Sequence, residues 1–506
     1  MATAVASGEV RADAPVAGTP PIGVLTWLSY GIGAIAPGVK GGAFTTFLLF
    51  YYSQVVGVPA TIVSGAIALT LFVDAFSDPF IGRWSDVTRT RWGRRHPFMY
   101  GSIIPVALFF TLTWFPPAGL SNMAMGFWIF ATAALTRMSL STFEISSNAL
   151  APELTESYGA RAGLFSLRYW FGYAGAYLFS AISLATFFAS TAKYPRGQLN
   201  PAAYPPFALT SAALIVVVIL ICALGTHNRI PYLRQSSTES GGGALSHLRE
   251  MLRSFSNRGF LTIFGFGVFK YSAIGLYTGT NLFFGTYLWK LNGGQLAILT
   301  LGGIAAATVA APLAPVAAHF FGKRISAMLF AILGVAWGLT PLFLALNHMF
   351  LTPGDPRLMP TLFFIDTTYG AMVAISLINT SAMLADVVED SAVKTGRRDS
   401  GTFFAAASFM QQCSVAIGIY MTGRVLAWSH FPDKPAPGSV TDDMVRSLLT
   451  HYIPASMGLW TIGALFLCFY PITRKRHEEN VAILRAREAE AIAIEQANLP
   501  VGGPLR

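Results

Sequence analysis

Two carboxylates stand four residues apart in an apolar part of this 506-residue chain. Asp74 and Asp78 follow an apolar run at 61–73, and a second apolar run follows at 98–115. Residues four apart share one helix face, with Cβ atoms about 6 Å apart. An ionised acid at the centre of a membrane helix costs about 2.5–3.5 kcal/mol, and a like-charged neighbour adds repulsion. A bound cation or proton would remove most of this cost, so the spacing predicts a cation site.

The composition predicts that these acids lie in a membrane protein. Hydrophobic residues make up 53% of the chain and charged residues only 11%, whereas soluble domains carry about 25% charged residues. The mean hydropathy is +0.53. At about 20 residues for each span, the apolar segments fit about twelve helices, half of them within 22–225 and half within 259–472. We therefore expect an all-α, multi-pass protein of the cell (inner) membrane.

Basic residues gather in alternate loops. The loop after the helix of Asp78 holds Arg91, Arg94 and Arg95, while the loops expected on the other side hold few basic residues. Because cytoplasmic loops of membrane proteins carry the excess of Lys and Arg, this bias predicts that both termini are cytosolic. It also accounts for the net charge of +10, so a nucleic-acid partner is not expected. The expected cytosolic segments are a leader at 1–21, a Ser/Gly-rich linker at 226–258 and a tail at 473–506.

Signatures of catalytic chemistry are absent from the sequence. The three cysteines, Cys222, Cys413 and Cys468, all lie in apolar segments and at no metal-ligand spacing. No nucleophile–base pair and no nucleotide-binding loop is found. We therefore expect neither an enzyme nor a bound cofactor, and no metal site other than Na+ at the two acids.

A second polar group falls in the apolar segment 122–150. Arg137, Ser141 and Glu144 stand at i, i+4 and i+7 and so form one stripe on a helix. Two interpretations are open: an internal ion pair between Arg137 and Glu144, or a cavity that Ser141 and Glu144 face. Ionisable residues within apolar segments are too numerous for all of them to face lipid. They are Lys40, Asp74, Asp78, Arg137, Glu144, Arg168, Lys270, Asp366 and Arg424.

The region around the two acids also carries a family resemblance. The string Asp74-Ala-Phe-Ser-Asp78-Pro-Phe-Ile-Gly-Arg-Trp-Ser-Asp86, followed by Thr88-Arg-Thr-Arg-Trp-Gly-Arg-Arg-His-Pro97, resembles helix 2 and the next loop of the glycoside–pentoside–hexuronide:cation symporters. This family is a branch of the major facilitator superfamily. The resemblance implies a major facilitator fold with twelve transmembrane helices in two six-helix halves. Two sequence echoes support such a repeat: Leu150–Ser157 with Leu384–Ser391, and Gly93-Arg-Arg with Gly322-Lys-Arg.

The resemblance also assigns residues to sites. Asp74 and Asp78 match the cation-site acids of the family, and Ser77 stands where the family has an asparagine, which leaves Na+ and H+ as alternative coupling ions. Ser141 matches a hydroxyl near the cation. The remaining matches concern the substrate: Glu144 and Arg168 match a sugar-binding acid and the arginine near it, while Gly38 (with Lys40 two residues later), Asn148 and Gln411 replace an acid, a tryptophan and a lysine of the sugar-binding members.

Charged residues at the expected cytosolic ends of the helices predict a gate. We expect some of them to form ion pairs between the two halves when the cavity opens outward. The alternative is that they are ordinary solvated loop charges. The gate would consist of a basic loop and of acids at the ends of helices 4 and 10: Arg91, Arg94 and Arg95, with Glu153, Asp386 and Glu389.

Together these features predict a secondary transporter that couples Na+ or H+ to the symport of a small polar solute, namely a sugar, a glycoside or a uronate. The expected partners are this solute and membrane lipid, and the protein is expected to be a monomer. Lys40 keeps open a second transport hypothesis, in which the solute is a non-sugar organic anion or an amphipathic molecule. A third hypothesis is a receptor that binds its ligand without translocating it.

Overall fold

The computed structural model is helical throughout the residues that it describes, which are 22–155, 157–233, 257–395, 400–436 and 439–498. The expected leader at 1–21 and most of the expected linker lie outside these residues. We call residues 24–227 the N-terminal helices and residues 258–468 the C-terminal helices. The long helices are α3 (Ala60–Val87), α5 (Ile103–Trp114), α6 (Asn122–Asn148), α8 (Tyr158–Thr186), α9 (Tyr204–His227), α11 (Arg258–Phe283), α12 (Gly293–Phe321), α13 (Lys323–Leu346), α14 (Leu358–Thr395), α15 (Ser400–Trp428), α16 (Asp442–Cys468) and α17 (Arg474–Asn498).

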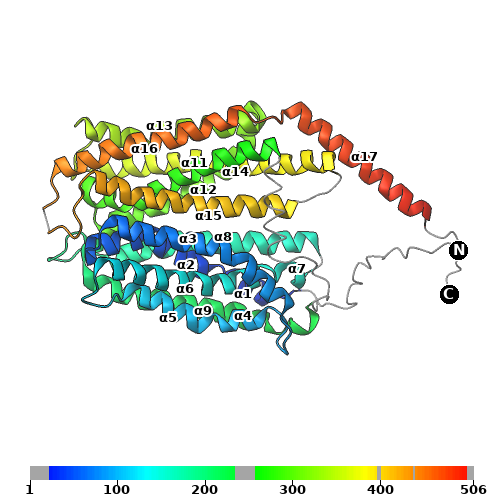
Figure 1. The fold of residues 1–506 in the computed structure, drawn as a ribbon, viewed down its shortest axis with the longest axis horizontal. Helices are drawn as coiled ribbons and strands as arrows, with labels where there is room; N and C mark the ends of the chain where they lie inside the picture. The colour runs from blue at the N-terminus through cyan, green and yellow to red at the C-terminus, as the bar shows by residue number, and fades with distance from the viewer. Residues whose placement is uncertain (1–21, 156, 234–256, 396–399, 437–438, 499–506) are drawn as a thin grey trace.

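The N-terminal and the C-terminal helices form two groups that lie side by side, with their axes along one common direction (Figure 1). In this view the blue and cyan helices lie together, and the green to orange helices lie together above them. The two groups meet where α3 packs against α15 and where α8 packs against α12. The α17 helix leaves the bundle at the end where the short helix α7 (Ala151–Leu154) also lies. We call this the α17 end.

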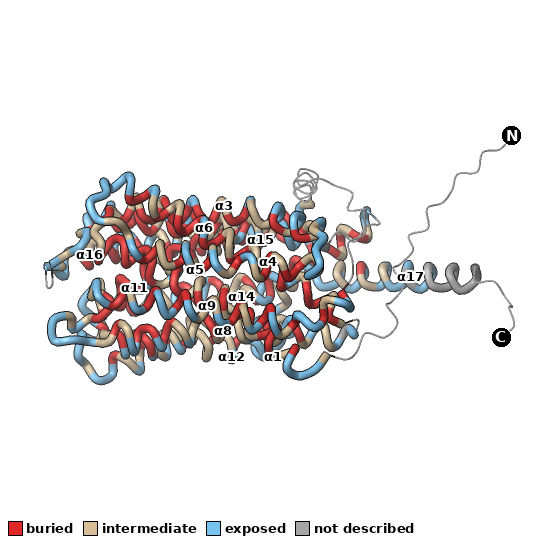
Figure 2. Tube along the Cα trace, turned by 90° about the horizontal axis from the view of Figure 1, so that it is seen from below, coloured by how far each residue is buried: buried red, intermediate tan, exposed pale blue. Residues whose placement is uncertain are grey.

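Ten of the described helical stretches are long and apolar enough to cross a membrane. Large apolar side chains such as Phe127, Phe320 and Leu465 are exposed on their outer surfaces, which suits a surface in contact with lipid rather than water. Buried residues run along the length of the bundle, and exposed residues gather in the loops at its two ends (Figure 2). The stretch 24–56 and α8 are not among the ten, so this criterion gives fewer spans than the twelve expected from the sequence.

The first apolar stretch does not form one regular helix. It consists of α1 (Val24–Ile32), α2 (Ile35–Ala43) and two π-helical segments, η1 (Phe44–Leu48) and η2 (Tyr51–Val56). Gly38 lies where α2 packs against α8, and a Cβ atom at this position would stand 2.4 Å from the carbonyl oxygen of Gly172. Small residues allow such close approach of helix backbones, so Gly38 determines how near the broken helix comes to α8.

The end of the bundle opposite α17 is closed by direct contact between the two groups of helices. Tyr287 OH of the C-terminal helices donates a hydrogen bond to Gln54 Oε1 of the N-terminal helices at 2.7 Å. Gly293, the first residue of α12, lies against the end of α8, and a Cβ atom there would stand 2.1 Å from the carbonyl oxygen of Phe188. Any larger side chain at Gly293 would therefore push the two groups apart at this end.

Candidate functional site

Asp74 is buried in the N-terminal helices beside a basic residue. It lies on α3 and is 7% exposed. Arg137 Nη1 on α6 lies 3.4 Å from Asp74 Oδ2, and Ser141 Oγ donates a hydrogen bond to Asp74 Oδ1 at 3.1 Å. Of the two interpretations of the stripe on α6, the ion pair between Arg137 and Glu144 is therefore wrong: Arg137 pairs with Asp74, because α3 packs against the same face of α6.

Asp78, one turn further along α3, has a different environment. Gln412 Nε2 of α15 donates a hydrogen bond to Asp78 Oδ2 at 3.4 Å, so this contact joins the N-terminal and C-terminal helices. Among the described residues, Asp78 Oδ1 is buried without a hydrogen-bond partner. Pro79 has no N–H, so the carbonyl of Ala75 lacks its usual helical donor. Hard cations take oxygen ligands of these two kinds, and a carboxylate can instead take a proton.

Two residues that the resemblance assigned do not lie where it placed them: Ser77 was expected at the cation site and Gln411 at the substrate site. Ser77 Oγ donates to the carbonyl oxygen of Asp74, within the backbone of α3, and not to either carboxylate. Gln411 is exposed on α15 and is absent from the wall of the cavity described next, whereas the neighbouring Gln412 contacts Asp78. A step of one residue along a helix turns the side chain by about 100°, which is why the adjacent glutamine reaches the acid.

A cavity of about 850 Å³ lies between the two groups of helices. Glu144 and Asn148 of α6 and Arg168 of α8 line its wall on the N-terminal side. Arg168 is fixed by two hydrogen bonds, from Nη2 to Ser147 Oγ at 3.0 Å and from Nη1 to the carbonyl oxygen of Tyr30 at 3.4 Å. Its guanidinium carbon also lies 4.9 Å from the centre of the Tyr30 ring. The cavity therefore brings together the predicted acid and arginine, although the hydrogen bonds of Arg168 go to Ser147 and Tyr30.

Lys40 of α2 is not part of the cavity wall. It lies near Asp74, Glu144 and Arg137, close enough for their charges to act on its ammonium group. Gly38 does line the cavity, and its contact with α8 leaves no room for the acid that the sugar-binding members of the resembling family have there. Lys40 therefore belongs to the charged group around Asp74 rather than to the cavity wall.

The basic loop after α3 pairs with an acid of the same group of helices. Arg94 Nη2 lies 2.7 Å from Glu153 Oε1 on α7, and Arg95 Nε lies 3.2 Å from the same oxygen. Arg95 Nη2 also lies 2.6 Å from Asp86 Oδ1. Arg91 is exposed. With the opposite end of the bundle closed, these ion pairs run within the N-terminal helices.

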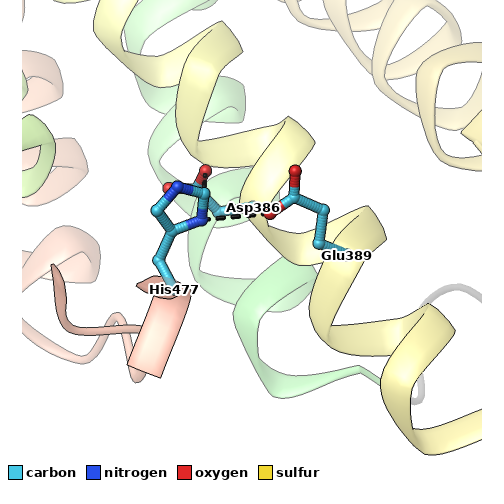
Figure 3. Close-up of side chains that lie close together, drawn as sticks. All are labelled: Asp386, Glu389 and His477. Carbon is cyan, nitrogen blue, oxygen red and sulfur yellow. Dashed lines mark ion pairs between the residues drawn. The ribbon is translucent and has the colours of Figure 1, made fainter. Parts of the chain in front are cut away.

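The acids of α14 at the α17 end pair within the C-terminal part of the chain. Asp386 Oδ1 lies 2.6 Å from Lys323 Nζ and 3.3 Å from His477 Nδ1 of α17. The same nitrogen of His477 lies 3.0 Å from Glu389 Oε2, so the imidazole stands between the two carboxylates (Figure 3). Two acids and a histidine are common metal ligands, but Lys323 already supplies a positive charge to Asp386. We therefore describe this group as an ion-pair cluster that holds α17 to α14.

The other ionisable residues of the apolar segments have separate environments. The ammonium nitrogen of Lys270 lies 4.7 Å and 4.6 Å from the ring centres of Phe266 and Tyr271, and the residue is 1% exposed. Arg424 is exposed. Asp366 lines the cavity on its C-terminal side. Of these three residues only Asp366 is placed to contact a solute in the cavity, and no specific role could be predicted for it from the sequence.

The chain is similar over most of its length to known transport proteins. A family model described as MFS/sugar transport protein matches residues 29–474. An uncharacterized symporter of Synechocystis sp. is 25% identical, over 92% of this chain and 97% of that protein. An isoprimeverose transporter of Lactiplantibacillus pentosus is 25% identical, over 92% of both chains. A glucuronide carrier protein homolog of Escherichia coli is 24% identical, over 92% of this chain and 96% of that protein.

Solved structures show the same fold. The crystal structure of the nucleoside transporter NupG matches with a TM-score of 0.60 at 14% sequence identity, over 89% of this chain and 100% of that chain. A D-xylose–proton symporter matches with a TM-score of 0.56 at 12% identity, over 89% of this chain and 97% of that chain. At these identities the likeness concerns the fold alone.

Proposed function

The chain belongs to the family of MFS/sugar transport proteins, and on this premise we propose that it is a symporter that couples Na+ or H+ to the movement of a sugar, glycoside or uronate across the cell (inner) membrane. One observation carries the proposal. A single helix, α6, serves both sites: Ser141 contacts the cation-site acid Asp74, and Glu144, three residues later, lines the cavity.

The proposed membrane arrangement has twelve spans in two six-helix halves, at 22–225 and 259–472. The stretch 24–56 and α8 are the two spans added to the ten that meet the length and hydropathy criterion. The α17 end is cytosolic, because the basic loop of Arg91, Arg94 and Arg95 lies there. The closed opposite end then makes this an inward-facing state, and the functional unit is a monomer.

Coupling follows from linkage between the two sites. A cation at Asp78 neutralises a charge next to Asp74 and Ser141, and it changes the contact that Gln412 makes from the C-terminal helices. If the cation raises the affinity for the sugar, the sugar must raise the affinity for the cation by the same factor. The two halves then rock about the central cavity and expose it to one side of the membrane at a time.

The charges of the cavity wall favour a polyhydroxylated solute over a non-sugar organic anion. The charged residues on the described wall are Glu144, Asp366 and Arg168, which are two acids and one base. An organic anion without hydroxyl groups would be repelled by the excess of negative charge, while carboxylates accept strong hydrogen bonds from the hydroxyl groups of a sugar or glycoside. For a uronate, Arg168 supplies a positive charge on this wall that can pair with the carboxylate of the solute. Lys40, on which the anion hypothesis depends, is not on the wall.

Counterflow in proteoliposomes tests the proposal. Vesicles loaded with lactose, isoprimeverose or methyl glucuronide should take up the labelled form of the sugar that the protein carries, and either a Na+ or a pH gradient should make the uptake concentrative. Binding without counterflow would support the receptor hypothesis. Competition by organic acids but by none of the sugars would support the anion hypothesis.

A further inference from the structure

The C-terminal wall of the cavity holds an acid that the cation site does not use. Asp366 of α14 accepts a hydrogen bond on Oδ1 from Tyr277 OH of α11, at 2.6 Å. Tyr369 lies one turn further along α14, and its ring centre is 5.3 Å from that of Tyr277 with an angle of 59° between the rings. All three residues line the cavity, and so does Tyr452 of α16. The carboxylate therefore lies among tyrosine rings at the surface of the cavity.

The charge of this acid is not neutralised by the part of the chain that the structure describes. There, Tyr277 is its one hydrogen-bond donor, and no Lys or Arg forms an ion pair with it. Asp74, the comparable acid of the N-terminal helices, has both Arg137 and Ser141. A carboxylate at membrane depth is costly unless it is paired or faces a wet cavity. The second oxygen of Asp366 therefore needs donors, and the cavity is the place from which a bound solute would supply them.

The size of the cavity and its lining point to a solute with more than one ring. Pockets for small molecules hold about 300–1,000 Å³, so a volume of about 850 Å³ is near the upper end of this range. Glu144 and Arg168 lie on the wall formed by the N-terminal helices, and Asp366 lies on the wall formed by the C-terminal helices. Tyrosine offers an apolar ring face together with a polar hydroxyl, and such a surface suits the C–H face of a sugar ring whose hydroxyls bind a carboxylate.

We propose that Asp366, Tyr277 and Tyr369 form a second substrate subsite, which binds the hydroxyl groups of the distal ring of a disaccharide-sized glycoside. Glu144 and Arg168 bind the first ring. This inference rests on the proposed function, because both subsites belong to the same cavity. A two-ring solute would contact both groups of helices at once, whereas a single ring would contact the N-terminal wall alone.

The test compares solutes of one and two rings on variants of the full-length protein. Calorimetry on the purified protein measures the affinities for lactose and methyl β-galactoside, and for isoprimeverose and methyl α-xyloside. For the disaccharide that the wild type binds, Asp366→Asn should lower the affinity at least tenfold, while the affinity for the matching single ring should change less than twofold. Tyr277→Phe, which removes the donor to Asp366, should lower the disaccharide affinity in the same selective way. Asp355→Asn, in the loop before α14, is the matched control and should change neither affinity.

The outcomes separate this inference from the function on which it rests. Equal losses for one and two rings, no loss for either, or a wild type that binds only single rings would each overturn the second subsite. An unchanged disaccharide affinity with fewer protons taken up for each sugar would assign Asp366 to proton binding instead and would also overturn it. In these cases Glu144→Gln still weakens sugar binding. If the wild type binds neither the four sugars nor methyl glucuronide, or if Glu144→Gln changes no affinity, the proposed function itself fails. Should Asp366→Asn not fold, Tyr277→Phe gives the same decision.

Discussion

Arg137 Nη1 lies 3.4 Å from Asp74 Oδ2, so one of the two acids of α3 already has a positive charge beside it. Asp78, one turn on, keeps a buried oxygen without a partner among the described residues. The spacing of the two acids predicted one shared site, but their surroundings make them unequal. Asp74 belongs to an ion pair with Arg137, and we propose that Asp78 is the acid whose charge a transported cation or proton neutralises.

Replacing each acid by its amide separates these roles. Asp78→Asn removes a charge that has no ion-pair partner among the described residues, so we expect concentrative uptake to be lost while the Tm holds or rises. Asp74→Asn leaves Arg137 buried and unpaired, and breaking a buried ion pair from one side costs about 3–5 kcal/mol. We therefore expect Asp74→Asn to lower the Tm and also to abolish uptake. Uptake in proteoliposomes and thermal melting of the two purified variants measure these effects, and full accumulation by Asp78→Asn would refute the cation site.

The two adjacent glutamines of α15 provide a matched pair of variants. Gln412 donates to Asp78 across the contact between the two groups of helices, and Gln411 is exposed. A hydrogen bond to a charged group is worth about 1.5–3 kcal/mol and here stabilises the ion-free carboxylate. Gln412→Ala should therefore strengthen cation or proton binding at Asp78 by a comparable amount and uncouple sugar uptake from the gradient, because the contact between the two groups of helices is lost. Gln411→Ala should leave both unchanged. Cation-dependent stabilisation of the Tm reports the first effect, and similar behaviour of the two variants would contradict the assignment.

Glu144→Gln tests the first substrate subsite. If the carboxylate accepts hydrogen bonds from sugar hydroxyls, the amide should weaken sugar binding by about 1.5–3 kcal/mol. Cation binding measured without sugar should change far less, because the ion pair and hydrogen bond of Asp74 do not involve Glu144. A lower Tm with normal sugar affinity in the folded protein would instead show that Glu144 has only a structural role.

Much of this organisation could be predicted from the sequence. The remaining features could not be predicted, for reasons that the structure identifies. Hydropathy and the motif at Asp74 predicted a helical membrane transporter, because burial in lipid constrains composition and because the motif is long and ordered. The partner of Arg137 could not be read from one helix, since the stripe on α6 shows only neighbours within that helix. The choice between Gln411 and Gln412 depends on helix rotation, which a motif does not determine. The cavity position of Asp366 depends on the packing of three helices, and its one sequence signal was an acid in an apolar segment.

The two ends of the bundle hold contacts of different kinds. At one end Gly293 fits against the carbonyl oxygen of Phe188, and at the other end the predicted gate residues pair within their own groups, such as Arg94 with Glu153. Alternating access requires that one end closes as the other opens. For Arg94 to pair with Asp386, each residue must give up its present partner. In both ion pairs the acid is the buried member: Glu153 is 6% exposed beside Arg94 at 20%, and Asp386 is 7% exposed beside Lys323 at 35%.

Gly293→Trp is expected to hold the opposite end open, because even a Cβ atom at this position would lie 2.1 Å from the carbonyl oxygen of Phe188. The α17 end should then close, and a cysteine pair introduced at Arg91 and Glu389, in a chain without its native cysteines, should cross-link more than in the parent protein. Gly294→Trp is the matched control, since Gly294 is exposed and a Cβ atom there meets only the side chain of Asn292 at 3.5 Å. It should leave cross-linking at the parent level. Equal cross-linking in both tryptophan variants would mean that the charged residues at the α17 end are ordinary loop charges and not a gate.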